Sequence, residues 1–220
     1  MEQILVYSDS ASWGIIPHTR RRLPFDQRWP GMLELRLNAD SATKYRVVED
    51  CLNGRRTVWE DPFKEGRNGL LGLQQRIEIN SPLALLIIML GTNDFQSAHQ
   101  NLAWHSAQGM ARLIQAARSA PVEPGMPIPP VLVVAPPSIT EPTGPIARKF
   151  AGAAQKCVEL ADELRQVCED VCCSFFDAGS VTSLSKMDGI HLDVDQHRVL
   201  AESLVAVVNS ILRDGTPVGS

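Results

Sequence analysis

Two segments in the middle of the chain, ALLIIML at residues 84–90 and VLVVA at residues 131–135, contain no polar residue. A strand with one wet face alternates apolar and polar residues, whereas a strand of a parallel sheet is covered on both faces and is apolar throughout. Segments this short and this uniform therefore predict central strands of a parallel sheet. They are far too short to cross a bilayer.

Apolar runs and amphipathic segments alternate along the whole chain. Strands are predicted over Gln3–Tyr7, Arg46–Glu49, Ala84–Leu90, Val131–Ala135 and Ser174–Asp177. Helices are predicted over Trp29–Leu37, Leu70–Ile79, Trp104–Ser119, Ala147–Cys172 and Gln196–Leu212. This alternation predicts an α/β fold, a three-layer α/β/α sandwich around a five-stranded parallel sheet. No linker divides the 220 residues, so we expect one domain over 1–213 and a flexible tail over 214–220.

Composition and charge exclude several function classes. A net charge of −4 does not suit a polyanionic partner, so we expect neither nucleic acid nor membrane to bind. The basic run Thr19–Arg22 could bind an anion, although a solvated loop is the favoured interpretation. The first residues lack the pattern of a signal peptide, so we expect a cytoplasmic protein. The five cysteines follow neither disulfide nor zinc spacing, which predicts reduced thiols and no metal.

Polar clusters follow the predicted strands at the points where these strands end. Residues Ser8–Ser12 follow the first strand, 51–57 follow the second, Gly91–Asp94 follow the third, and Met187–His191 follow the fifth. The proline-rich segment Pro136–Pro145 follows the fourth. Because loops at the carboxyl ends of parallel strands share one edge of the sheet, we expect these clusters to meet in one crevice.

The residue types in these clusters suit nucleophilic catalysis. The hydroxyl of Ser10 needs a base to remove its proton, and the imidazole of His191 titrates near neutral pH. Asp188, three residues before His191, can hydrogen-bond the other ring nitrogen and fix the tautomer. Taken alone, each residue has an ordinary structural explanation, such as a helix cap for Ser10. Asp177 at the end of the fifth strand is a rival for the acid, although a capping role is favoured for it.

Acyl transfer also needs hydrogen-bond donors aimed at the developing oxyanion. Asn93 offers a side-chain amide, Gly54 a backbone N–H that no side chain obstructs, and Ser10 its own N–H. These three residues are the predicted oxyanion hole.

At this point the sequence resembles a known family. The stretches SDSAS, LNGRRT, GTND and DGIH match, in order, the four blocks of the SGNH hydrolases, the GDSL-type esterases. The segments SWG, IIMLGTND, FFDAGSV and DGIHL resemble the bacterial arylesterase/acyltransferase subgroup. The resemblance implies a flavodoxin-like SGNH hydrolase fold over the single domain. It also implies a cofactor-free serine esterase that acts on small aryl or short-chain alkyl esters through an acyl-serine. Some relatives transfer the acyl group to alcohols and some form oligomers, so acyl transfer and a homo-oligomer stay open.

The chain departs from the family pattern beside the nucleophile. Ser8 replaces a glycine and is expected to strain the turn, whereas Ala11 replaces a leucine and is expected to widen the acyl side. Asp9 matches the family aspartate and is interpreted as a structural hydrogen-bonding residue. We assign substrate contacts to Ala11, Trp13, Asn53 and Ile190, with a core or interface role equally open for Trp13.

Other functions remain open on the sequence alone. The same site could serve an acyltransferase, a thioesterase or a carbohydrate deacetylase. A flavodoxin-like module that binds phosphate or flavin is disfavoured, because the first loop has one glycine, Gly14, and Asp9 would repel an anion. A degenerate family member with a structural role is the third possibility. Arg55 and Arg56 could steer an anionic substrate, although a salt bridge to Asp61 or Glu60 is favoured.

Overall fold

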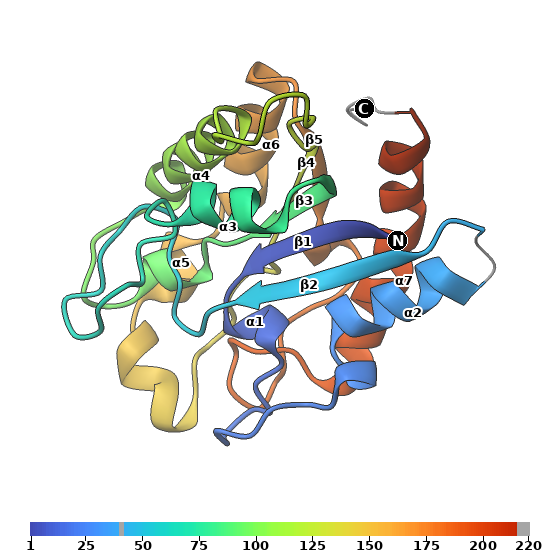
Figure 1. Cartoon of the computed structure of the whole chain (residues 1–220). Coiled ribbons are helices and arrows are strands. Elements are labelled where there is room, and N and C mark those ends of the chain that lie inside the picture. The colour runs from blue at the N-terminus through green and yellow to red at the C-terminus, as the bar shows by residue number, and fades with distance from the viewer. Residues whose placement is uncertain (40–41, 215–220) are drawn as a thin grey trace.

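The computed structural model describes residues 1–39 and 42–214 (Figure 1). Its strands are β1 (Glu2–Ser8), β2 (Tyr45–Cys51), β3 (Leu83–Met89), β4 (Val131–Ala135) and β5 (Ser174–Asp177). Its α-helices are α1 (Ser10–Trp13), α2 (Trp29–Ala39), α3 (Leu73–Asn80), α4 (Ala103–Arg118), α5 (Ala153–Lys156), α6 (Leu160–Asp170) and α7 (Val194–Asp214). Short 3₁₀ helices are η1 (Phe25–Gln27), η2 (Thr92–Phe95), η3 (Gly144–Phe150) and η4 (Ala178–Ser180). Of the predicted tail, residues 215–220 lie outside the described residues.

The five strands form one parallel sheet in the order β2-β1-β3-β4-β5. Helices α2 and α7 pack against each other on one face, while α3, α4 and α6 cover the other (Figure 1). This arrangement confirms the predicted three-layer α/β/α sandwich, and the strand order is that of a flavodoxin-like sheet.

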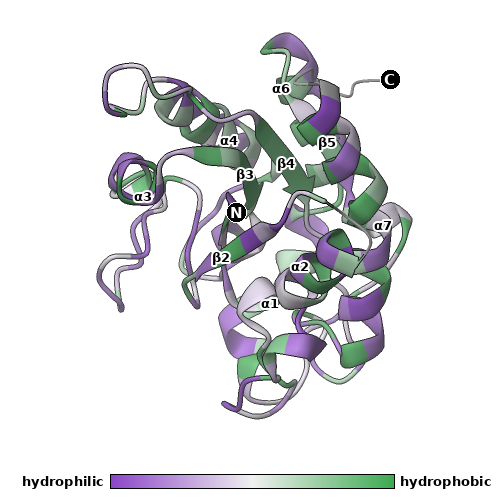
Figure 2. Ribbon diagram, turned by 45° about the vertical axis from the view of Figure 1, so that its right-hand side comes forward, coloured by the Kyte–Doolittle hydropathy of each residue, from purple (hydrophilic) through white to green (hydrophobic). Residues whose placement is uncertain are grey.

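The two uniformly apolar segments are the buried centre of the sheet, as predicted. Every residue of β4 is buried, and six of the seven residues of β3 are buried. Figure 2 shows the hydrophobic colour concentrated on these strands and on the helix faces that cover them. A strand sandwiched between two helix layers has no wet face, so the pattern of alternating polar residues is absent.

The register of the sheet places three strand ends side by side. Ser8, the last residue of β1, lies opposite Cys51 of β2 and opposite Met89 of β3. These are also the last residues of their strands. The loops that carry Ser10, Gly54 and Asn93 therefore leave the sheet at one level and at one edge.

One predicted helix, Ala147–Cys172, is wrong. The chain there forms η3, α5 and α6 in succession. Gly152 adopts a left-handed backbone conformation, with φ +75°, and separates η3 from α5. A left-handed residue cannot continue a right-handed helix, so the helix is interrupted at Gly152. The apolar periodicity of the sequence did not reveal this interruption, because it reports side chains and not backbone conformation. Residues of η3 line a hollow at the carboxyl edge of the sheet.

A core substitution tests the role of the central strand. Leu86 of β3 is fully buried, whereas Leu35 of α2 is 51% exposed. We expect Leu86→Ala to lower the free energy of unfolding by about 2–5 kcal/mol, because it removes buried methyl groups and leaves a cavity. Leu35→Ala, the same change on the surface, should alter the free energy of unfolding by less than about 0.5 kcal/mol. Urea unfolding of both variants measures the difference, and equal losses would contradict this core.

Candidate active site

The first turn after β1 places Ser10 at the start of a very short helix. Asp9 caps α1, because its Oδ1 accepts a hydrogen bond of 2.9 Å from the Ala11 N–H. The helix ends at Gly14, whose φ of +84° is a conformation that glycine adopts without strain. Ser10 is largely buried, and its hydroxyl lies at the carboxyl edge of the sheet.

Ser10, His191 and Asp188 form a continuous chain of hydrogen bonds. The Ser10 Oγ lies 3.2 Å from His191 Nε2, and His191 Nδ1 lies 2.7 Å from Asp188 Oδ2. Residues 181 positions apart in sequence thus meet within hydrogen-bond distance. All three side chains are less than one-tenth exposed. The spacing suits transfer of a proton from the hydroxyl to the ring.

The loop around Asp188 holds this carboxylate in place. Its Oδ1 accepts hydrogen bonds from the N–H groups of Ile190, at 3.0 Å, and His191, at 2.9 Å. Burial alone would raise the pKa of Asp188, but the hydrogen bonds and the charge of His191 outweigh it and hold the pKa below its usual value. The acid is therefore ionised near neutral pH and orients the imidazole.

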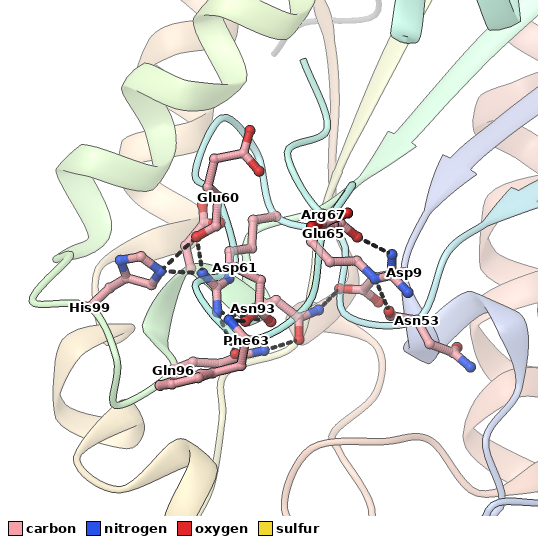
Figure 3. Close-up of polar contacts among 12 residues, drawn as sticks. Asp9, Asn53, Glu60, Asp61, Phe63, Glu65, Arg67, Asn93, Gln96 and His99 are labelled. Carbon is pink, nitrogen blue, oxygen red and sulfur yellow. Dashed lines mark hydrogen bonds and ion pairs between the residues drawn. The ribbon is translucent and has the colours of Figure 1, made fainter. Parts of the chain in front are cut away.

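The side-chain amide of Asn93 is fixed at both ends (Figure 3). Its Nδ2 donates to Asp9 Oδ2 at 2.8 Å, and its Oδ1 accepts from Gln96 Nε2 at 2.7 Å. Arg56, fully buried, donates in turn to Gln96 Oε1 at 2.5 Å. An amide nitrogen carries two hydrogens, so the second N–H of Asn93 is still able to donate to a ligand. The sequence reasoning missed Gln96, whose only signal was its position just after GTND.

The predicted oxyanion donors line one small hollow of about 60 Å³. Ser10, Asn53, Gly54, Asn93 and His191 all contribute to its wall. Within the described residues, the backbone N–H groups of Ser10 and Gly54 make no hydrogen bond with the protein. They are consequently able to donate to a bound oxygen atom.

A larger hollow of about 390 Å³ adjoins the first and shares His191 with it. Its wall comes from the loop after α1, from η3 and from the loop of Asp188 and His191; of these segments, residues 146–150 of η3 were not predicted as part of the site. The residues that form it are Ile15, His18, Thr19, Arg20, Pro145, Ile146, Lys149, Asp188 and His191. Of the proline-rich segment Pro136–Pro145, only Pro145 contributes. The larger hollow is thus partly apolar and carries cations.

Three of the four predicted substrate contacts do not line either hollow. Ala11 and Ile190 are buried in the hydrophobic core, and the ring of Trp13 is covered by the guanidinium of Arg22, 4.8 Å away. Asn53 alone lines the small hollow. Ala11 follows Ser10 directly in α1, and successive residues of a helix point in different directions, so nearness in sequence did not bring Ala11 into the wall of the site.

The expected strain at Ser8 is also wrong. Ser8 ends β1, and φ is positive at only two non-glycine residues of the described chain, His18 and Cys172. Its hydroxyl donates to the Met89 carbonyl at 2.7 Å and lies 2.6 Å from Ser12 Oγ. The serine therefore adds hydrogen bonds to the base of the turn instead of distorting it.

Other polar residues near the sheet edge have structural partners. Asp177 caps η4 by accepting from the Gly179 N–H at 2.8 Å, which confirms the predicted capping role. Arg56 lies 3.3 Å from Asp61, as expected. Among the described residues, no group of three or more His, Cys, Asp or Glu side chains is arranged to hold a metal ion. No helix within residues 1–39 and 42–214 has the length and apolar character needed to cross a bilayer.

Comparison with known proteins agrees with this geometry. The sequence model of the GDSL-like lipase/acylhydrolase family matches residues 9–199. The chain belongs to this family. No curated protein sequence matches it significantly. As a GDSL-like lipase/acylhydrolase with esterase neighbours among solved structures, it is an ester-hydrolysing enzyme.

Two of those solved structures have the same fold over nearly their full length. A carbohydrate acetylesterase family member from Sinorhizobium meliloti is 31% identical, with a TM-score of 0.90 and coverage of 97% of this chain and 100% of the other. The aryl esterase of M. smegmatis, in its inhibitor-bound form, is 34% identical, with a TM-score of 0.90 and coverage of 96% and 99%. The GDSL-like chain thus shares its whole domain with both.

The buried carboxyl of Asp9 in this GDSL-like enzyme generates a pH-dependent prediction. Burial raises the pKa of Asp9 from 3.8 to about 6, against the hydrogen bond from Ala11, the charge of His191 and the hydrogen bond from Asn93. A raised folded pKa stabilises the fold below about pH 4, and this stabilisation is lost as the pH rises through 6. Between pH 4 and 7 the wild type should therefore lose about 2 kcal/mol of unfolding free energy relative to Asp9→Asn.

Urea unfolding at several pH values measures this difference. Asp26→Asn, at an exposed position, is the matched control and should run parallel to the wild type. If the difference in unfolding free energy between wild type and Asp9→Asn stays constant from pH 4 to 7, Asp9 does not titrate as expected.

Proposed function

We propose that the enzyme is a serine esterase that hydrolyses small carboxylic esters through an acyl-serine intermediate. The observation that carries this proposal is the continuous hydrogen-bond chain from Ser10 through His191 to Asp188. In this proposal Ser10 is the nucleophile, His191 the general base and Asp188 the acid that orients it. No metal or organic cofactor takes part.

The reaction proceeds in two halves. His191 Nε2 takes the proton of Ser10 as the Oγ attacks the ester carbonyl, and the resulting imidazolium is stabilised by ionised Asp188. The tetrahedral intermediate collapses to the acyl-serine, and His191 gives its proton to the departing alcohol oxygen. A water molecule then loses a proton to His191 and attacks the acyl-serine. Collapse of the second intermediate releases the carboxylic acid and returns the proton to Ser10 Oγ.

Three donors stabilise the negative charge on the former carbonyl oxygen. They are the N–H groups of Ser10 and Gly54 and the second N–H of Asn93, which border the same small hollow as the Ser10 hydroxyl. Because Asp9 and Gln96 hold the amide of Asn93 at both ends, the amide need not reorganise when the charge develops. Fixed donors in a site shielded from water stabilise a transition state more than mobile solvent does.

The shape of the site supports small substrates. The hollow of about 60 Å³ beside Ser10 suits the reacting ester group, while the adjoining hollow of about 390 Å³ accommodates an aryl, sugar-sized or short alkyl group of the substrate. Similarity to an aryl esterase and to a carbohydrate acetylesterase supports the same range. An alcohol bound in the larger hollow could replace water in the second half, so transfer of the acyl group is compatible with this site.

Removal of the nucleophile tests the proposal. Ser10→Ala should lower kcat/KM for 4-nitrophenyl acetate by at least about 10⁴-fold, because no covalent intermediate forms. The variant should also resist labelling by a serine-directed phosphonate, which mass spectrometry detects as an adduct on Ser10 in the wild type. Ser183→Ala, at an exposed position, is the control and should retain activity and labelling. Full turnover by Ser10→Ala would refute this mechanism.

The oxyanion role of Asn93 has its own test. Asn93→Ala should lower kcat about 10²- to 10³-fold with a much smaller change in KM, because the lost hydrogen bond acts in the transition state. Asn80→Ala, on α3 away from the site, serves as the comparison. Steady-state kinetics with urea unfolding separates catalysis from stability. An unchanged kcat in folded Asn93→Ala would exclude the amide from the oxyanion hole.

A further inference from the structure

Three cations from distant parts of the sequence border the catalytic hollows. Arg20 comes from the loop after α1, Lys64 from the loop after β2, and Lys149 from η3. Arg20 and Lys149 line both hollows, and Lys64 lines the small hollow that contains Ser10. All three are exposed at the mouth and therefore accessible to a ligand.

These cations lack the carboxylate partners that surface cations commonly have. In the described chain, the side chains of Arg20, Lys64 and Lys149 form no hydrogen bond and no ion pair. The single carboxyl group that lines the two hollows is Asp188, which is already held by His191 and by two backbone N–H groups. The walls of the two hollows thus carry more cationic than anionic side chains.

The three cations also affect one another. Burial lowers the pKa of Lys149 first of all, and the charges of Arg56, Lys64 and Arg20 lower it further, against the opposing effect of Asp61. Arg56 is paired with Asp61, so it leaves little free charge for a ligand. A ligand anion seated among Arg20, Lys64 and Lys149 would relieve this mutual repulsion.

The sign of this charge differs from that of the whole protein, which has a net charge of −4. A positive site on a negative protein raises the local concentration of anions and guides them to the site. The apolar side chains Ile15 and Ile146 line the larger hollow together with Arg20, Lys149 and His191.

We propose that the preferred substrates are anionic esters, which carry a carboxylate or another anionic oxygen group that Arg20, Lys64 and Lys149 bind. This inference rests on the proposed esterase function and specifies its substrate class. The apolar wall receives the carbon skeleton, and the anion lies at the mouth. The basic run Thr19–Arg22, favoured as a solvated loop from sequence, thereby contributes Arg20 to recognition.

Two matched substrate pairs test the proposal and distinguish the side of the ester that carries the charge. On the acyl side, the monoester of adipic acid with 4-nitrophenol is compared with 4-nitrophenyl hexanoate. On the alcohol side, 4-acetoxybenzoate is compared with its methyl ester. Each kcat/KM is divided by the rate of alkaline hydrolysis of the same ester. We expect the charged member of at least one pair to be favoured about tenfold at low ionic strength, and 0.5 M NaCl to reduce this preference.

Neighbouring cations in the sequence supply matched control variants. Arg20→Gln and Lys149→Gln should each reduce the ratio of charged to neutral kcat/KM about two- to fivefold, the size of a solvent-exposed ion pair. Arg21→Gln and Arg148→Gln remove an adjacent exposed charge that lines neither hollow, and should leave the ratio unchanged. Equal reductions by all four variants would indicate a general effect of net charge and overturn the proposal.

The outcome also separates this inference from the proposed function. One outcome overturns the anion preference alone. In it, the wild type hydrolyses the neutral esters, Ser10→Ala does not, and both members of each pair react at equal rates. The anion preference is also overturned if neither 0.5 M NaCl nor the variants Arg20→Gln and Lys149→Gln reduce the preference for the charged esters. If none of the four esters is hydrolysed, the proposed function and the inference built on it both fail.

Discussion

A single buried carboxyl group, Asp9, connects the parts on which this site depends. One of its oxygens caps α1, the helix that presents Ser10, and the other holds the amide of Asn93 from the end of β3. Burial disfavours the ionised form, as the raised pKa shows, and the hydrogen bonds that Asp9 accepts only partly offset that cost. The register of β1 against β3 makes the connection possible, because the two strands end opposite each other. The carboxyl group thus keeps the nucleophile and the amide at a fixed separation.

The parts of the fold that follow from local chemistry could be predicted. The bounds of β4 and β5 agree residue for residue with the prediction. β4 is a uniformly apolar run between two prolines, and β5 is a short aromatic pair between two polar residues, so each strand has clear limits in the sequence. The segment 144–170 could not be predicted, because its apolar positions continue at helical spacing through a break that Gly152 makes with its backbone and not its side chain. Periodicity reports which face is buried, and it does not report whether the backbone continues.

The same division applies to the site. Ser10, Gly54, Asn93 and His191 follow strand ends or precede the last helix, so the topology alone gathers them at one edge. Lys64 lies in the loop after β2, and Ile146 and Lys149 lie in η3, two segments whose path depends on tertiary packing. Their place in the wall could not be derived from any local pattern. Trp13 lines neither hollow for a similar reason, since Arg22 from another segment covers its ring.

These two sets of residues differ in how firmly they are held, and this difference suits their roles. Asn93, Gln96 and Arg56 are buried, and each is bound to the next, so one arrangement is strongly favoured and the amide of Asn93 has a fixed position. Arg20, Lys64 and Lys149 are exposed, and no ion pair with the described residues constrains them. Long cationic side chains of this kind can adapt to anions of different shape at small cost. In the proposed mechanism, the buried residues would therefore fix the reaction and the exposed cations would select among esters, so changes in the loops can alter substrate choice without disturbing the buried residues.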